Sequence, residues 1–315
     1  METPRLAQTN PASARRVSSG TRELRAPAGL CLAEALAARW QSYRQQLRSC
    51  REDFSEEGIH KLRVATRRLI AHLVLLGDVM RSAELEKARR ILKRRMVALG
   101  KLRDTHVQRA LIASQATRFP ELGLLRAWLE RRERRLARSA ARQVAGCKTR
   151  KLGKWVRALA RELSAKSRGA RAQSRLASTV LRTTAAAFAQ AVERRQAIAL
   201  ADLRTIHQTR VAFKRFRYMV EALSPDLTGL SKRQLRALAY YQRKMGLIQD
   251  LEVMRACVAR FIQEDAEAEA PLGRFAHYLQ RRRARALRIF LQSADRLFDF
   301  WPPTGLTAAG ERAGL

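Results

Sequence analysis

The sequence predicts an all-α protein, and three observations support this fold class. Only 15 Gly and 8 Pro interrupt the 315 residues, and the strong helix formers Ala, Leu, Arg, Glu and Gln dominate between them. No segment of useful length alternates apolar and polar residues with the period of two that marks a half-buried strand. Hydrophobic residues make up 46% of the chain, which is enough for a core and excludes a disordered polycation.

Glycine and proline place the helices of the first half, because Gly favours helix ends and Pro cannot continue a helix. Gly58 and Gly77 bracket the second predicted helix, Phe119–Pro120 ends the third segment, and Gly146 ends the fourth. The predicted helices are 30–50, 58–78, 83–115, 121–145 and 151–165. Residues 1–29 are expected to form a disordered N-terminal tail.

Similar signals divide the second half. A stretch rich in Ser, Gly, Arg and Lys at 166–175 predicts a linker, and Ser224–Pro225 and Ala270–Pro271 predict two further breaks. The predicted helices are 174–198, 203–223, 231–263, 271–293 and a short one at 294–301. Residues 302–315 are expected to form a C-terminal tail.

Charge identifies the class of partner. The chain carries 64 Lys and Arg against 28 Asp and Glu, a formal net charge of +36, which favours a polyanion. The longest apolar run, Leu69–Met80, is too short and too interrupted to cross a membrane, so no membrane insertion is expected. The N-terminus lacks the apolar region of a secretory signal, which predicts a cytoplasmic protein. The widely spaced Cys31, Cys50, Cys147 and Cys257 are expected to be reduced packing residues.

An internal repeat locates part of this positive charge in the sequence. Ile59–Arg68 and Ile206–Arg215 share six identities in ten positions, 147 residues apart. A second pair of blocks, Leu99–Val107 and Met245–Val253, keeps Gly, Asp and Val, and a weaker third pair is Trp128–Arg132 and Tyr278–Arg282. The order is the same in both halves, which predicts a duplicated helical unit of about four helices each.

On a helical wheel, both copies of the first block have one apolar face and one basic face. The basic faces carry His60, Lys61, Arg63, Arg67 and Arg68 in one half, and His207, Arg210, Lys214, Arg215, Arg217 and Tyr218 in the other. Glu221 shares the second face and is a candidate partner for Arg217 or Arg210. A basic face is usually only solvated. Here, uncompensated like charges recur at matched positions, which favours a ligand site.

Phosphate is the ligand that suits these faces. The planar Arg guanidinium donates two hydrogen bonds to one phosphate group and stays charged at physiological pH. His60 and His207 each have two possible roles. Each histidine is either a hydrogen-bond donor that becomes protonated when phosphate binds or a neutral hydrogen-bond partner that orients a neighbouring Arg. The sequence is compatible with both interpretations.

The linked motifs resemble those of the CHAD family, the conserved histidine α-helical domain. The resemblance rests on Ile59–Leu69 with Leu99–Asp104 and on His207–Glu221 with Met245–Asp250, and it covers roughly residues 30–300. It implies two tandem antiparallel four-helix bundles, at 30–165 and 176–301, related by a pseudo-twofold axis. It also implies a basic cleft between them that binds inorganic polyphosphate, and association with polyphosphate granules. The cleft lining implied by the motifs is His60, Arg63, Arg67, Arg68, His207, Arg210, Lys214, Arg215, Arg217 and Tyr218.

Several other residues have two possible roles. Further basic residues are either phosphate contacts or part of a solvated face: Lys61, Arg90, Arg94, Arg131, Arg135, Arg281 and Arg285. Gly100 and Gly246 predict close helix contact or a local irregularity. Asp104 and Asp250 are expected to orient arginines rather than catalyse. His106 stands where related sequences often have an acid, so its role is open.

Catalysis is not expected. The sequence has no P-loop and no cluster of metal-binding carboxylates of the kind that phosphoryl transfer requires, so neither a metal nor another cofactor is predicted. The rival function is nonspecific binding of DNA or RNA by the same basic surface, since phosphate contacts alone support it. Aromatic residues are only 6% of the chain, which leaves little for base stacking and places nucleic acid second.

Overall fold

The structure is a computed structural model that describes residues 22–24, 26–199 and 202–301. The helices of its first part are α1 (Ala28–Glu52), α2 (Glu56–Val79), α3 (Ala83–Ala98), α4 (Gly100–Ala113), α5 (Gly123–Ala145) and α6 (Arg150–Lys166). Those of its second part are α7 (Ala170–Gln196), α8 (Arg204–Leu223), α9 (Lys232–Glu264) and α10 (Glu269–Leu291). Short 3-10 helices lie at Pro120–Leu122, Ala266–Ala268 and Ala294–Phe300. The predicted all-α class is confirmed.

Serine side chains begin three of these helices. Ser55 accepts a hydrogen bond from the Gly58 amide at the start of α2, and Ser82 does the same for Leu85 at the start of α3. At the start of α9, Ser231 and Gln234 form a reciprocal capping box. Each cap satisfies amide groups that have no partner inside the helix, which fixes where the helix begins.

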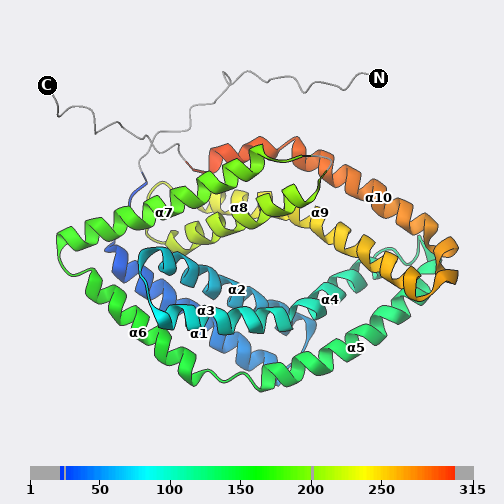
Figure 1. Ribbon diagram of the computed structural model, residues 1–315, viewed down its shortest axis with the longest axis horizontal. Coiled ribbons are helices and arrows are strands. Elements are labelled where there is room, and N and C mark those ends of the chain that lie inside the picture. The colour runs from blue at the N-terminus through cyan, green and yellow to red at the C-terminus, as the bar shows by residue number, and fades with distance from the viewer. Residues whose placement is uncertain (1–21, 25, 200–201, 302–315) are drawn as a thin grey trace.

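The helices pack around a continuous hydrophobic core. In the first part, α1 packs against α2 and α6, and α2 packs against α3. In the second, α7 packs against α8, and α9 packs against α8 and α10. Helix α7 also contacts α1 and α2, so one core cluster includes Leu36 and Leu73 of the first part together with Phe213 and Phe216 of the second. Figure 1 shows α2 and α4 facing α8 and α9 across the middle of the molecule.

The structure differs from the sequence prediction at one helix and at one linker. The predicted helix 83–115 is interrupted at Leu99, whose amide bonds the Val97 carbonyl instead of continuing the α-helical pattern, and Gly100 begins α4. The predicted linker 166–175 is only three residues long, because Gly169 turns the chain at a φ of 86° and helix-forming residues follow at once. The segment 294–301 is a 3-10 helix at Ala294–Phe300.

The predicted N-terminal tail, residues 1–29, is ordered at its described end. Arg22 Nη1 donates to the Thr228 carbonyl at 3.1 Å, Leu24 forms a β-bridge with Leu227, and α1 begins at Ala28. Backbone and side-chain hydrogen bonds to a distant loop hold this segment, and a sequence pattern does not display such contacts. The rest of that tail, and residues 302–315, lie outside the described residues.

Cysteine burial follows the sequence prediction. Cys31, Cys50 and Cys257 are buried, and Cys147 is partly exposed. Within the described part of the chain, no helix is both long enough and apolar enough to cross a membrane.

Candidate anion-binding site

A cavity of about 510 Å³ opens where five helices meet. Helices α2 and α8 contribute the residues of the repeated block, α4 and α9 contribute those of the second block, and α10 contributes one arginine. The polar lining consists of His60, Arg63, Arg67, Arg103, Asp104, Gln108, His207, Arg210, Lys214, Gln249, Asp250 and Arg282.

The apolar faces of α2 and α8 determine what reaches the cavity. Ile59 and Leu69 of α2 and Phe213 and Phe216 of α8 are buried in the core. Because residues three or four positions apart share a helix face, burying these side chains turns the opposite, basic face of each helix outwards. The two basic faces therefore meet across the cavity. Six residues of the predicted lining are brought together there: His60, Arg63, Arg67, His207, Arg210 and Lys214.

Three of the lining arginines are held by other groups. Arg63 Nη1 donates to the Met96 carbonyl at 3.0 Å, and Arg103 Nη1 pairs with Glu56 Oε1 at 2.6 Å. Arg282 Nη1 donates to the Tyr278 hydroxyl at 3.1 Å. These contacts fix the guanidinium groups in place while leaving further N–H donors of each group for a ligand.

The other three cations have no such partner. Within the described chain, Arg67, Arg210 and Lys214 make no ion pair within 4.0 Å and no side-chain hydrogen bond. Burial, together with the positive charges of Arg67 and Arg210, lowers the pKa of Lys214 to about 8. Burial likewise lowers the pKa of the Arg210 guanidinium, which Asp250 partly counteracts. Unpaired, half-buried cations repel one another, so an anion that enters the cavity removes an existing energetic cost.

The two histidines occupy the cavity differently. His207 Nδ1 donates to Gln249 Oε1 at 2.7 Å, so its fixed partner is an amide and not an arginine. Burial lowers the pKa of His60, and the positive charges of Arg103, Arg67 and Arg63 act in the same direction. His60 therefore favours the neutral form in the empty cavity, and a bound anion would favour its protonation.

Two carboxylates line the same cavity. Asp104 of α4 and Asp250 of α9 occupy matched positions in the second repeated block. Partial burial raises the pKa of Asp250, Arg210 opposes this shift, and the charge of Asp104 adds to it. The two carboxylates are therefore close enough to repel each other.

Four predicted lining residues lie outside the cavity wall. Arg215 Nη2 pairs with Asp78 Oδ2 at 2.7 Å, and Arg68 is exposed on α2. Arg217 Nε pairs with Glu221 Oε1 at 3.1 Å, which is one of the two partners predicted for Glu221. The Arg217 guanidinium carbon lies 4.9 Å from the centroid of the Tyr218 ring. Tyr218 is 7% exposed and belongs to the packed interior of α8.

The additional basic candidates are not brought to the cavity either. Lys61 pairs with Glu57 at 3.4 Å on the surface of α2. Arg94 lines a separate, largely apolar cavity of about 330 Å³ that also includes Tyr43 and Cys147. The remaining candidates are exposed on α3, α5 and α10, and none lines the cavity: Arg90, Arg131, Arg135, Arg281 and Arg285.

The cavity includes polar residues that the sequence reasoning did not select, namely Arg103, Gln108, Gln249 and Arg282. Arg103 directly precedes Asp104 in the second repeated block, and Arg282 ends the third block, so the repeat itself contained a signal for both. Arg281 is a candidate from the sequence analysis, but adjacent positions on a helix point about 100° apart, and Arg282 is the one that lines the cavity. No motif distinguishes Gln108 from a solvated glutamine.

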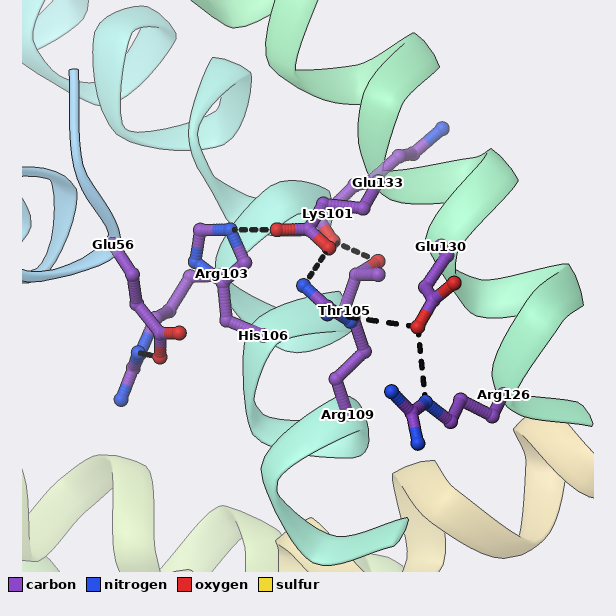
Figure 2. Close-up of polar contacts among 9 residues, drawn as sticks. All are labelled: Glu56, Lys101, Arg103, Thr105, His106, Arg109, Arg126, Glu130 and Glu133. Carbon is purple, nitrogen blue, oxygen red and sulfur yellow. Dashed lines mark hydrogen bonds and ion pairs between the residues drawn. The ribbon is translucent and has the colours of Figure 1, made fainter. Parts of the chain in front are cut away.

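His106 belongs to a network that joins α4 to α5 (Figure 2). The side chain is 3% exposed, and its Nε2 lies 3.3 Å from Glu133 Oε1. Arg109 bridges Glu133 and Glu130, and Arg126 pairs with Glu130 at 3.0 Å. The position of His106 is therefore structural, since it faces α5 and does not line the cavity.

The fold and the site together define an all-helical protein with a cation-lined cavity between its helices. The CHAD domain model matches residues 32–259, which is most of the chain. The chain therefore belongs to the CHAD domain family.

Solved structures agree with this assignment. The CHAD domain from the plant Ricinus communis superposes with a TM-score of 0.62 at 23% sequence identity, covering 88% of this chain and 92% of that one. PptA from Streptomyces chartreusis superposes with a TM-score of 0.64 at 20% identity, covering 86% and 100%. At these identities the likeness concerns the fold alone. A comparison with curated proteins finds no match.

Proposed function

We propose that this protein binds inorganic polyphosphate in the cavity between α2, α4, α8 and α9, without catalysing a reaction on it. The observation that carries the proposal is the set of half-buried cations, Arg67, Arg210 and Lys214, that face one cavity and, among the described residues, make no ion pair. A phosphate chain supplies one negative charge per internal unit and no hydrogen-bond donors, which is the complement of such a lining. Membership of the CHAD family supports the same ligand.

Nucleic acid is the alternative ligand, and the lining is less suited to it. Apart from two histidines, none of the described lining residues is aromatic, so bases that entered would find no stacking platform. A duplex is also far wider than a bare phosphate chain and would remain at the mouth of the cavity. Exposed cations elsewhere on the molecule still give nonspecific affinity for DNA and RNA.

The proposal includes a duplicated architecture. It takes 30–165 and 176–301 as two related four-helix units with the basic cleft between them. Support comes from the matched pairs Arg63 with Arg210, Arg67 with Lys214, and Asp104 with Asp250, because each half of the chain contributes one member of every pair to the lining of one cavity. Such an arrangement would let a chain with repeating charge meet equivalent groups in both halves. Association with polyphosphate granules and a cytoplasmic location are part of the same proposal.

Competition distinguishes the two ligands. Labelled long-chain polyphosphate is bound to the protein at about 0.15 M salt and challenged with duplex DNA and with RNA at equal phosphate concentration, because such affinities depend steeply on salt. We expect unlabelled polyphosphate to displace the label at much lower concentration than either nucleic acid. Displacement by DNA at parity would reject the cavity as a polyphosphate site.

Charge reversal tests the location. We expect Arg63→Glu with Arg210→Glu to weaken polyphosphate binding by at least about 100-fold, because each reversal replaces an attraction to phosphate by a repulsion. The matched control is Arg44→Glu with Arg48→Glu, two exposed arginines one turn apart on α1 that make the same change in net charge. Fluorescence anisotropy measures both affinities. Equal losses would mean diffuse charge attraction and no defined site.

A further inference from the structure

A hydrogen bond between two helices holds the His207 ring at the cavity wall. His207 of α8 and Gln249 of α9 both line the cavity, and His207 Nδ1 donates to Gln249 Oε1 at 2.7 Å. The two residues are 42 positions apart in the chain, so tertiary packing creates this contact. The His207 side chain is exposed, and within the described chain no group bonds its other ring nitrogen, Nε2.

This partner determines which nitrogen of the ring carries a proton. Gln249 Oε1 is a carbonyl oxygen, which only accepts, so Nδ1 carries the proton of their hydrogen bond. In the neutral ring Nε2 then has no proton, whereas in the protonated ring Nε2 becomes a second donor and Nδ1 keeps the same partner. The Gln249 contact therefore survives protonation and leaves Nε2 for a ligand that accepts hydrogen bonds. A phosphate oxygen is such a ligand.

The first half of the repeat holds its histidine differently. Arg103 of the second repeated block stands where the other half has Gln249. Within the described residues, no hydrogen bond holds the His60 ring. Burial and the charge of Arg103 lower the pKa of His60, so the matched residue opposes protonation there. A neutral amide beside His207 adds no such repulsion.

Holding the ring in advance strengthens binding. A side chain that rotates freely loses this freedom when it contacts a ligand, and the lost entropy weakens the affinity. The ring of His207 is already fixed through Nδ1, so less freedom remains to be lost. Gln249 has no charge that would attract phosphate by itself. Its competing role is a direct hydrogen bond from its amide nitrogen to phosphate, and only the indirect role requires His207.

We propose that Gln249 is a positioning residue for the ligand of the cavity: it holds His207 through Nδ1 so that protonated Nε2 donates to a phosphate oxygen. This inference rests on the proposed function. It also makes the two repeated halves unequal, because the residue matched to Gln249 is a cation that already pairs with Glu56.

A double-mutant cycle tests whether Gln249 acts through His207. Polyphosphate affinity is measured by fluorescence anisotropy at about pH 6 and about 0.15 M salt, because protonation and screening both affect it. The four proteins are the wild type, Gln249→Leu, His207→Phe and the double variant. The matched control is Gln45→Leu, the same change at an exposed glutamine of α1.

We expect the two substitutions not to add. His207→Phe should weaken polyphosphate binding by about ten-fold, as the loss of one charge-assisted hydrogen bond does. Gln249→Leu should weaken it by about three-fold or more, because the ring is no longer held. In the His207→Phe background, Gln249→Leu should change the affinity by less than about two-fold. Gln45→Leu should bind like the wild type.

The position of the ring proton gives a second measurement, which does not depend on polyphosphate. Heteronuclear NMR distinguishes protonated from unprotonated ring nitrogens, and the signals of His207 are those missing in His207→Phe. When the ring is neutral, we expect wild-type His207 to carry its proton on Nδ1 and Gln249→Leu to lose this preference. A neutral ring with its proton on Nε2 in the wild type would mean that the Gln249 amide nitrogen is the donor, and would overturn the proposal.

The outcomes separate the positioning role from the proposed function. If the wild type binds no polyphosphate, the proposed function fails, and the positioning role fails with it. If polyphosphate binds and Gln249→Leu weakens it equally with and without His207, Gln249 contacts phosphate directly and only the positioning role is rejected. An unchanged affinity in Gln249→Leu would reject it as well. Should Gln249→Leu unfold, as judged by circular dichroism, Gln249→Ala is measured in the same way.

Discussion

Lys214 shows how a binding residue can oppose folding. Its ammonium group is half-buried among Arg67, Arg210, Arg217 and Arg63, and its pKa is lowered from 10.5 to about 8. At pH 7 the folded protein therefore holds a charge that the unfolded chain accommodates more easily. The unpaired Lys214 cation therefore lowers the stability of the folded protein, and such a loss of stability is common at functional sites.

Lys214→Met should stabilise the protein and weaken polyphosphate binding. Removing the charge is expected to raise the free energy of unfolding at pH 7 by about 1 to 3 kcal/mol, a range reduced to allow for partial exposure. Chemical denaturation measures this change. Lys93→Met, an exposed position on α3, is the control and should change stability little. A Lys214 variant no more stable than the wild type would contradict the buried charge.

The same residue predicts a pH dependence. Folding lowers the Lys214 pKa to about 8, so the destabilisation is complete below pH 8 and disappears as pH rises towards 10.5. Wild-type stability should rise over that interval by more than the stability of Lys214→Met. Polyphosphate binding favours the charged form, so wild-type affinity should fall above pH 8.

His60 predicts a second pH dependence, at lower pH. Because burial and neighbouring arginines lower its pKa, His60 must take up a proton if it is to donate to phosphate as an imidazolium. Affinity for polyphosphate should then decrease as pH rises from about 5.5 to 7.5, through the ordinary histidine range. His60→Gln should flatten this profile, measured by anisotropy in buffers of constant ionic strength. A profile that is unchanged in His60→Gln would assign His60 a neutral role.

At the scale of elements, arginine side chains of one helix bind the carbonyl groups at the end of another helix. Arg51, near the end of α1, donates to the carbonyls of Val144 and Ala145 at the end of α5 and of Cys147 beyond it. One guanidinium therefore satisfies the open end of α5 and ties it to α1. The interruption between α3 and α4 has a similar role, because Arg63 of α2 binds the Met96 carbonyl there.

Arg51→Ala should lower the free energy of unfolding by about 1 to 3 kcal/mol, since hydrogen bonds from a charged group to three carbonyls are lost, one of them partly buried. Arg48→Ala, an exposed arginine on the same helix, should change it by less than about 0.5 kcal/mol. Urea denaturation measures both. Equal effects of the two substitutions would mean that the junction between α5 and α6 does not depend on Arg51.

Most helices were predictable because their signals are local. The serine caps of α2 and α9, and the buried positions of α8 at Phe213 and Phe216, follow from residues within one or two turns. The interruption at Leu99 was not predicted, because a single Gly inside a helical pattern is compatible with both a continuous and a broken helix. Gly246 shows this directly, since it lies within the uninterrupted α9.

At the scale of the whole molecule, the two parts share one core. Helix α7 packs against α1 and α2 as well as α8, and the buried residues of both parts form a continuous cluster. The predicted division at 166–175 therefore does not separate two independent cores.

We expect the full chain to unfold in a single cooperative transition, because neither part can lose its packing without exposing the other. Differential scanning calorimetry measures this, and polyphosphate should raise the transition temperature because it binds the folded state. Two resolved transitions, with only one of them shifted by polyphosphate, would contradict a shared core and a cavity built from both parts.

By itself, the sequence determined the all-α class, the matched basic faces around His60 and His207, and the relation to the CHAD family, because periodicity and motifs are local properties. Tertiary structure decided which cations meet. It placed Arg103 and Arg282 in the cavity and directed Arg215 to Asp78. A helical wheel gives the direction of a side chain on its own helix, but not which neighbouring helix covers that direction. That depends on packing between segments more than a hundred residues apart, as does the lining of one cavity by both Asp104 and Asp250.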